Sequence, residues 1–214
     1  DVNGAYDAAL SAVITDTSIV LDAGCSRGDP DLPSISTAKH AVGCDADIAG
    51  LRANTIVRSR VATPLETLPF RSEAFDVIVC KFVIEHVPSP ARVFQEFWRV
   101  LRPGGVIAVL TPNRLSLFAL ISSLVPYGLK QSIKHWLFGG HPEDTFRTYY
   151  RANTPRTLDR LFRETGFVCD RMEMLAGMWA FFIFNTPLAL FVRAIERAQT
   201  HVPLARQCST HIMG

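Results

Sequence analysis

The stretch IVLDAGCSRGDP, residues 19–30, joins a short apolar run to a loop that contains two glycines. The apolar run ends on an acid, Asp22, and the loop then passes through Gly24 and Gly28. A short run of Val, Ile and Leu is typical of a buried strand. Glycines after a strand allow positive φ and let a ligand approach the main chain without meeting a Cβ. The stretch therefore predicts a strand followed by a ligand-binding loop.

Three further apolar runs, at residues 40–45, 75–80 and 105–110, have the same character. Each is too short for a helix and too continuous for a half-exposed strand. All four runs are therefore predicted to be buried parallel strands. Residues 167–175 and the final residues 208–214 are also expected to contain strands.

Two helices are predicted from apolar spacing and from end signals. In residues 89–105 the apolar side chains share one helical face, and the helix is expected to end before Pro103. In residues 153–167, Thr154 can cap a helix, Pro155 suits its first turn and Gly166 can close it. The two apolar faces comprise Val93, Phe94, Phe97, Trp98 and Leu101 in the first helix and Leu158, Leu161 and Phe162 in the second.

This alternation of strands and helices predicts an α/β fold with a Rossmann-like, doubly wound sheet. In such a sheet, ligands bind beyond the carboxyl ends of the strands, where the strand order reverses. The loop after Asp22 follows such a strand end. No repeat, low-complexity tract or linker divides the chain, so residues 1–214 are expected to form a single domain.

The spacing of the glycine loop distinguishes between classes of nucleotide ligand. A dinucleotide-binding loop needs G-x-G-x-x-G to bring a pyrophosphate onto a helix N-terminus. Residues 22–28 read D-x-G-x-S-x-G instead, which argues against a nucleotide-cofactor oxidoreductase. The second apolar run ends on Asp45, where an acid can accept hydrogen bonds from ribose hydroxyls. Loop and acid together indicate a nucleoside ligand without a pyrophosphate.

Four segments within residues 18–113 carry a family resemblance: VLDAGCSRG, VGCDAD, LPFRSEAFDVIVCKFVIEHV and LRPGGVIAVLTPN. In order and spacing they resemble the motifs of class I S-adenosylmethionine-dependent methyltransferases, most closely the ubiquinone- and menaquinone-biosynthesis-like members. The resemblance implies a seven-stranded sheet whose last strand is antiparallel. It also implies S-adenosylmethionine as the cofactor, S-adenosylhomocysteine as the product and methyl transfer as the reaction.

The resemblance further implies which residues hold the cofactor. The glycine loop would hold the methionine part, and Asp45 would hold the ribose hydroxyls. The backbone carbonyl near Lys81 would hold the methionine amino group, and the amide of Leu65 would meet an adenine nitrogen. The expected cofactor-binding residues are Asp22, Gly24, Cys25, Ser26, Gly28, Asp45, Ala46, Leu65 and Lys81.

The chain departs from the family pattern in two places. Ser26 stands where the family usually has a glycine, a replacement that is tolerated if its φ is negative. Thr63 and Pro64 stand where the family often has Gly-Asp, so an acidic contact to the adenine amino group is missing. The loss of one such hydrogen bond weakens cofactor binding by ~1 kcal/mol.

Candidate residues for catalysis and acceptor binding lie after two of the strands. His86, in IEHVPSP, is the candidate catalytic residue because an imidazole can take a hydroxyl proton near neutral pH; the alternative is a packing or capping role. Arginines in the segment HPEDTFRTYYRANT, 141–154, suit an anionic acceptor, although this segment can equally be a solvated surface loop. The candidate acceptor-binding residues are His141, Arg147, Tyr149, Tyr150 and Arg151.

Composition excludes several other classes of protein. With 22 basic and 20 acidic side chains, a net charge of +2 argues against a nucleic-acid partner. Five cysteines without regular spacing fit reduced thiols in the cytoplasm, and no spacing of His, Cys and acids predicts a metal site.

Two strongly apolar segments are residues 115–138 and 174–192. Together they provide more apolar surface than is needed to cover a minimal sheet of this fold. They are expected to belong to helical or lid insertions at 114–153 and 174–207. The second is just long enough to span a bilayer, but Asn185, Thr186 and Pro187 interrupt it. The insertions are therefore expected to pack together, to line an apolar pocket or to contact a membrane surface.

Taken together, the sequence predicts an enzyme that methylates oxygen or carbon of a small, hydrophobic, lipid-like acceptor. The expected location is the cytoplasm with peripheral membrane contact. The alternative from another class is a non-catalytic cofactor-binding or membrane-associated protein on the same fold, which Ser26 and Pro64 keep open.

Overall fold

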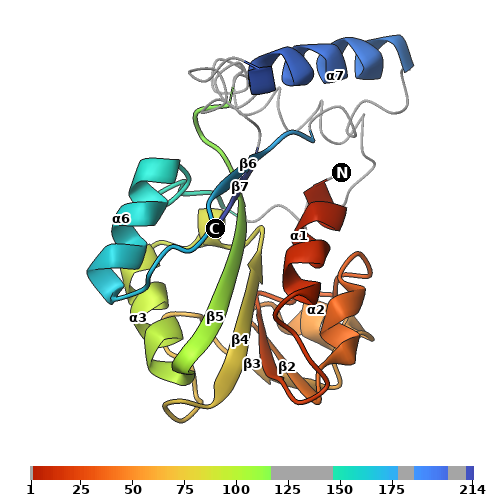
Figure 1. The fold of residues 1–214 in the computed structure, drawn as a ribbon. Helices are drawn as coiled ribbons and strands as arrows, with labels where there is room; N and C mark the ends of the chain where they lie inside the picture. Colours follow the sequence, from red (N-terminus) through yellow and green to blue (C-terminus); the bar gives the residue numbers. More distant parts are fainter. Residues whose placement is uncertain (1, 117–146, 178–185, 202–210) are drawn as a thin grey trace.

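The computed structural model of the chain describes residues 2–116, 147–177, 186–201 and 211–214. Within these residues a seven-stranded sheet has the order β3-β2-β1-β4-β5-β7-β6 (Figure 1). The first five strands pair in parallel, and β7 runs antiparallel to both β5 and β6. The strands are β1 (Ile19–Ala23), β2 (His40–Asp45), β3 (Ser59–Ala62), β4 (Phe75–Lys81), β5 (Leu101–Pro112), β6 (Glu173–Leu175) and β7 (His211–Met213).

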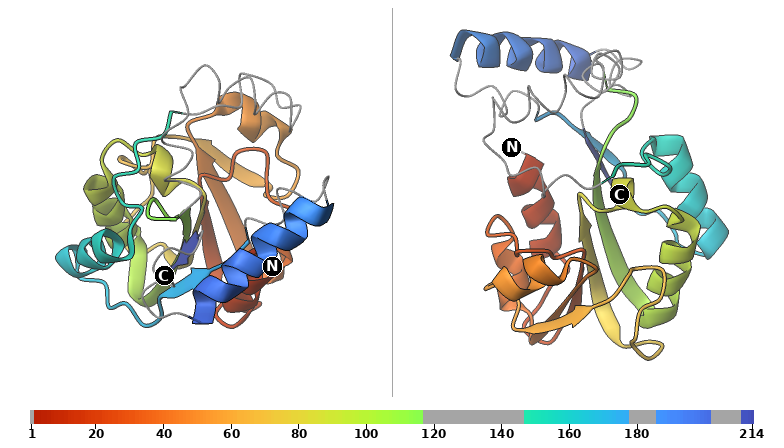
Figure 2. Two further views of the ribbon diagram at one scale, coloured as in Figure 1. Left: turned by 90° about the horizontal axis from the view of Figure 1, so that it is seen from above. Right: turned by 180° about the vertical axis from the view of Figure 1, so that it is seen from behind.

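Helices cover both faces of this sheet, so the predicted doubly wound arrangement is confirmed. The helix pair α1 and α2 lies on one side of the sheet and the pair α3 and α6 on the other, as both Figure 1 and Figure 2 show. The helical segments are α1 (Val2–Ser11), α2 (Ile48–Ala53), α3 (Pro90–Val100), α6 (Pro155–Thr165), α7 (Thr186–His201) and the 3-10 turns η1 (Pro33–Thr37) and η2 (Ile84–His86).

The central strands are buried on both faces because alternate side chains enter two separate cores. Val20 and Val77 belong to the core beneath α1, with Tyr6 from that helix. Leu21 and Ile78 belong to the core beneath α3 and α6. This two-sided burial explains why the sequence of these strands is a continuous apolar run.

The strand order reverses between β1 and β4, which have neighbours on opposite sides. In β1, Asp22 lies opposite Val79 of β4. Ligands in doubly wound sheets bind beyond the carboxyl ends of the strands at such a switch point. The fold therefore brings the glycine loop to this place.

Four predicted strands and two predicted helices are confirmed. The α6 signals act as expected: the Thr154 hydroxyl accepts a hydrogen bond from the Thr157 amide at 3.2 Å, and Gly166 has φ 96°. The strand expected within residues 208–214 is β7. Of residues 167–175, only Glu173–Leu175 form a strand, which is β6. The helices α1 and α2 and the edge strand β3 were not predicted.

Trp98 was predicted to lie on the buried face of α3, and this is wrong. Its side chain is 52% exposed, and its ring meets Phe167 edge to face at a centroid distance of 5.0 Å. A Cβ at Gly166 would lie 3.1 Å from the indole. The indole thus covers the end of α6 instead of entering the core.

The two predicted insertions lie partly outside the described residues. In the second, α7 begins at Thr186, directly after Asn185, and Pro187 takes its first turn. In the part of the chain that is described, no helix is both long enough and apolar enough to cross a membrane. Residues 117–146 and 178–185 are not described, and the candidate acceptor residue His141 is among them.

Candidate functional site

The loop after β1 is held by backbone hydrogen bonds, one to β2 and one within the loop. The amide of Gly24 donates to the Cys44 carbonyl at 2.7 Å, and the amide of Gly28 donates to the Cys25 carbonyl at 2.7 Å. Gly24 has φ 82° and Gly28 has φ 85°, the region that favours glycine. A Cβ at Gly24 would lie 2.2 Å from a methyl carbon of Val83, so this position has no room for a side chain.

Ser26 adopts a positive φ of 34°, so the condition under which a serine is easily tolerated here is not met. The cause is the set of partners that hold its backbone. Its amide donates to Asp45 Oδ2 at 2.9 Å, and its carbonyl accepts from Asn54 Nδ2 at 3.0 Å. The loop therefore keeps the conformation of a glycine at a residue that has a side chain, at a cost of about 1 kcal/mol.

Asp45 lies at the end of β2, beside this loop. Its Oδ1 accepts the amide of Asp47 at 2.8 Å, while Oδ2 accepts the amide of Ser26. Each carboxylate oxygen has two lone pairs. The carboxylate can therefore hold the loop and still accept hydrogen bonds from two ribose hydroxyls. The neighbouring Ala46 is exposed.

Two other predicted cofactor residues turn their side chains away from the loop surface. Leu65 is 6% exposed and belongs to the core beneath α3, so only its backbone is available to a ligand. The Cys25 thiol packs on β2, because a Cβ at Gly43 would lie 2.5 Å from its sulfur. Burial raises the pKa of Cys25 to about 12, which keeps the thiol protonated.

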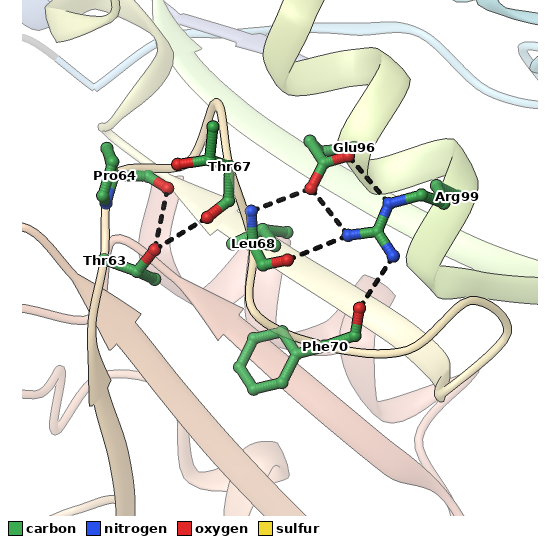
Figure 3. A network of polar contacts seen from close by, with 7 residues as sticks. All are labelled: Thr63, Pro64, Thr67, Leu68, Phe70, Glu96 and Arg99. Atoms are coloured by element: carbon green, nitrogen blue, oxygen red, sulfur yellow. Dashed lines mark hydrogen bonds and ion pairs between the residues drawn. The ribbon is translucent and has the colours of Figure 1, made fainter.

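The segment that carries Leu65 is anchored to α3 by an ion pair (Figure 3). Glu96 Oε2 accepts the amide of Leu68 at 2.8 Å. Arg99 donates to the Leu68 carbonyl at 2.9 Å and to the Phe70 carbonyl at 2.7 Å. Glu96 and Arg99 also bond each other at 2.7 Å, so one pair on one helix fixes the loop after β3.

Three acidic groups surround the end of β1. Burial raises the pKa of Asp22 to about 7, and the charges of Asp29 and Asp45 add to this effect. Lys81 lowers the same pKa, and its Nζ lies 2.5 Å from Asp29 Oδ2. The loop after β1 and Asp45 at the end of β2, here called the cradle, therefore have charged groups of both signs at the side where Asp29 and Lys81 lie.

The candidate catalytic residue and the acceptor segment lie together beyond β4. His86 Nδ1 lies 3.1 Å from the Arg147 carbonyl oxygen. The amides of Tyr149 and Tyr150 donate to the carbonyl of Glu85 at 2.7 and 3.2 Å. The structure therefore brings His86 beside residues 147–151.

The aromatic ring of Tyr149 contacts two of the predicted acceptor residues. The guanidinium of Arg147 lies 5.0 Å from the ring centroid, and that of Arg151 lies 5.6 Å from it. Arg151 also donates to the Pro88 carbonyl at 2.5 Å. Tyr150 is held at φ 50°, an uncommon conformation for a bulky residue.

Sequence reasoning missed a buried polar cluster beneath this region. Glu85 is 3% exposed and accepts from the Thr111 hydroxyl at 3.1 Å. Asn153 Nδ2 donates to the same hydroxyl at 2.6 Å. Burial raises the pKa of Glu85 to about 7. The sequence held one signal for this cluster. Glu85 directly follows the apolar residues Val83 and Ile84, a position at which a side chain is expected to be buried.

The geometry fits a nucleoside cofactor with an amino-acid tail. The glycines let the loop fold closely against Val83 and Ile56 beside the end of β1. Asp45 has acceptor capacity for a ribose, and charges of both signs lie at Lys81 and Asp29. In the residues that the structure describes, no group of three His, Cys, Asp or Glu side chains is arranged to hold a metal ion.

Comparison with known proteins agrees with this fit. The methyltransferase domain family matches residues 21–109. The ubiquinone biosynthesis O-methyltransferase of Xylella fastidiosa is 30% identical over 169 residues, which cover 66% of this chain and 69% of the relative. The chain belongs to the family of S-adenosylmethionine-dependent methyltransferases.

Other relatives and a solved structure extend the comparison. The ubiquinone biosynthesis O-methyltransferase of Hahella chejuensis is 34% identical over 115 residues, 49% of this chain and 48% of the relative. An S-adenosylmethionine-dependent methyltransferase from Mesorhizobium loti has the same fold, with a TM-score of 0.61 at 16% identity over 100% of this chain and 98% of that one. The chain spans 39 to 55% of the length of three curated relatives that it matches.

Proposed function

We propose that the protein transfers the methyl group of S-adenosylmethionine to an oxygen of a small acceptor. The observation that carries the proposal is the position of the Asp45 carboxylate, which holds the glycine loop at the switch point of a methyltransferase sheet. The family membership supports the cofactor. The acceptor atom is supported by relatives whose names describe O-methyltransferases.

His86 is the proposed general base. A carbonyl oxygen can only accept a hydrogen bond, so the contact from Nδ1 to the Arg147 carbonyl places the proton on Nδ1. Nε2 then carries the lone pair. Glu85 Oε1 lies 4.0 Å from Nε2, and in its ionised form, above about pH 7, it favours the imidazolium that forms when Nε2 takes a proton.

The proposed reaction is an in-line displacement, in which alignment contributes most of the rate. When bound, the cofactor supplies a methyl group on a positively charged sulfur. The acceptor oxygen forms a bond to the methyl carbon as the bond to sulfur breaks, and the sulfur leaves as a neutral thioether. His86 takes the hydroxyl proton of the acceptor.

The proposed acceptor is a hydrophobic phenol or a related small molecule with an anionic group. Arg147 and Arg151 lie on the ring of Tyr149, beside His86, and arginine pairs readily with carboxylates. The names of the ubiquinone-biosynthesis relatives support a quinone-related acceptor. Carbon methylation of the same ring is the second outcome that product analysis would distinguish.

The test is transfer of labelled methyl from S-adenosylmethionine to a panel of polyprenylated and simple hydroxybenzoates. Wild-type protein is expected to methylate a ring hydroxyl, and His86→Gln to lower the rate ~100-fold or more while binding S-adenosylhomocysteine normally. His40→Gln is the matched control, because His40 is exposed at the start of β2. Tight cofactor binding without transfer to any acceptor would overturn the proposal in favour of a non-catalytic binding protein.

A further inference from the structure

A buried lysine lies at the charged end of the cradle. The Lys81 side chain is 7% exposed, and its Nζ lies 2.5 Å from Asp29 Oδ2, whose side chain is 33% exposed. Lysine is almost never buried to this extent unless it is paired. Its desolvation is costly, so a lysine placed here calls for an explanation beyond sheet packing.

Both members of the pair border the loop where the cofactor is proposed to bind. Lys81 is the last residue of β4, the strand that pairs with β1, and Asp29 directly follows Gly28. Both residues lie close enough to Asp22 to change its pKa, Asp29 raising it and Lys81 lowering it. The pair therefore lies beyond the adjacent carboxyl ends of β1 and β4.

The chemistry of this pair matches an α-amino acid, which carries one carboxylate and one ammonium group. A bound zwitterion can exchange the single ion pair of the protein for two ion pairs, one with each member. The exposed part of Asp29 is the side from which such a ligand can approach. Charge-assisted hydrogen bonds of this kind are shorter and stronger than neutral ones.

We propose that Lys81 and Asp29 form a charge clamp for the amino-acid end of the cofactor. The ammonium of Lys81 binds the methionine carboxylate, and the carboxylate of Asp29 binds the methionine ammonium. This inference rests on the proposed cofactor site. It gives the Lys81 side chain a role in addition to that expected of its backbone carbonyl.

The clamp predicts which part of the cofactor each residue recognises. Methylthioadenosine has the adenosine and the sulfur but no amino acid, so it cannot use the clamp. The contribution of the clamp is therefore the part of the affinity difference between S-adenosylhomocysteine and methylthioadenosine that is lost when Lys81 or Asp29 is replaced.

The experiment is calorimetric titration of both compounds into wild-type protein, Lys81→Met and Lys39→Met, where Lys39 is an exposed control. Lys81→Met is expected to weaken S-adenosylhomocysteine binding by ~10-fold or more, the effect of one lost charged hydrogen bond. Its affinity for methylthioadenosine is expected to stay within ~3-fold of wild type, and Lys39→Met to change neither affinity.

A second variant keeps the test decisive if Lys81→Met does not fold. Asp29→Asn is expected to weaken S-adenosylhomocysteine selectively as well, because an amide does not balance the ligand ammonium. Equal weakening of both compounds, or no weakening of either, would overturn the clamp. If wild-type protein binds neither compound, the proposed cofactor site itself fails, a result distinct from failure of the clamp alone.

Discussion

The carboxylate of Asp45 accepts the amide of Ser26 at 2.9 Å, so the acid at the end of β2 holds the glycine loop at the end of β1. The same carboxylate is the expected partner of the ribose. We therefore expect the loop conformation and the proposed ribose contact to depend on one side chain, so that replacing Asp45 changes both.

Replacing Asp45 by alanine is expected to destabilise the protein even without a ligand. Two backbone amides, those of Ser26 and Asp47, lose a charged acceptor, at about 2 kcal/mol in the free energy of unfolding. Urea denaturation measures this loss. Asp47→Ala is the matched control, since it removes the N-cap of α2 at about 1 kcal/mol without touching the loop. Equal effects of the two changes would contradict the account.

Replacing Ser26 by glycine is expected to stabilise the protein by about 1 kcal/mol, because glycine adopts a φ of 34° without steric cost. Ser26→Val is expected to be destabilising, since a β-branched residue is a strong outlier at positive φ. Thermal unfolding of the two variants checks the order. A Ser26→Gly protein that unfolds at a lower temperature than wild type would show that the hydroxyl is needed.

The conformation of Ser26 also shows where prediction from the sequence ends. The glycine pattern and the two acids that end strands were visible as local patterns, and the fold brings the loop and Asp45 together. The sign of φ at Ser26 depends on Asp45 and on Asn54, which are distant in sequence and become neighbours only in the folded protein. No local pattern contains that information.

The elements missed by sequence reasoning have similar physical causes. The edge strand β3 reads SRVA and has alternating half-buried residues, so it has no continuous apolar run. The helix α1 buries only Val2, Tyr6 and Leu10. Trp98 was assigned to the core because it is spaced from the other apolar residues of α3 as on one helical face. Its indole instead packs over Gly166, the residue that ends α6.

Replacing Arg99 by leucine is expected to loosen the segment 63–70, because two backbone carbonyls and Glu96 lose their donor. The expected cost is about 2 kcal/mol in the free energy of unfolding. A several-fold weaker affinity for adenosine-containing ligands should accompany it, since Leu65 belongs to this segment. Arg163→Leu is the control: its ion pair with Asp159 is exposed on α6, and the expected cost is below about 0.5 kcal/mol. If both variants lose the same stability, the anchoring role is wrong.

Replacing Glu85 by glutamine is expected to change how stability depends on pH. Burial raises the pKa of Glu85 from 4.5 to about 7, so between these values the folded protein binds a proton that the unfolded chain has lost. Wild-type protein therefore loses stability as pH rises through this window, by on the order of 3 kcal/mol from this group. Glutamine cannot lose a proton, and its carbonyl oxygen can still accept from the Thr111 hydroxyl.

The comparison to make is urea denaturation of wild type and Glu85→Gln at about pH 5 and about pH 7.5. The variant should gain stability relative to wild type at the higher pH. Asp22, whose pKa is also raised to about 7, is present in both proteins and cancels in the difference. Parallel losses in the two proteins would show that Glu85 does not titrate in this range.

The central claim, that the cradle between β1 and β2 binds the methyl donor, is tested most directly by calorimetric titration with S-adenosylhomocysteine. Wild-type protein is predicted to bind one equivalent with micromolar affinity. A folded Asp45→Asn variant is predicted to bind at least ~10-fold more weakly, because an amide nitrogen cannot accept from a ribose hydroxyl. A wild-type protein that unfolds cooperatively yet binds no S-adenosylhomocysteine at millimolar concentration would contradict the claim.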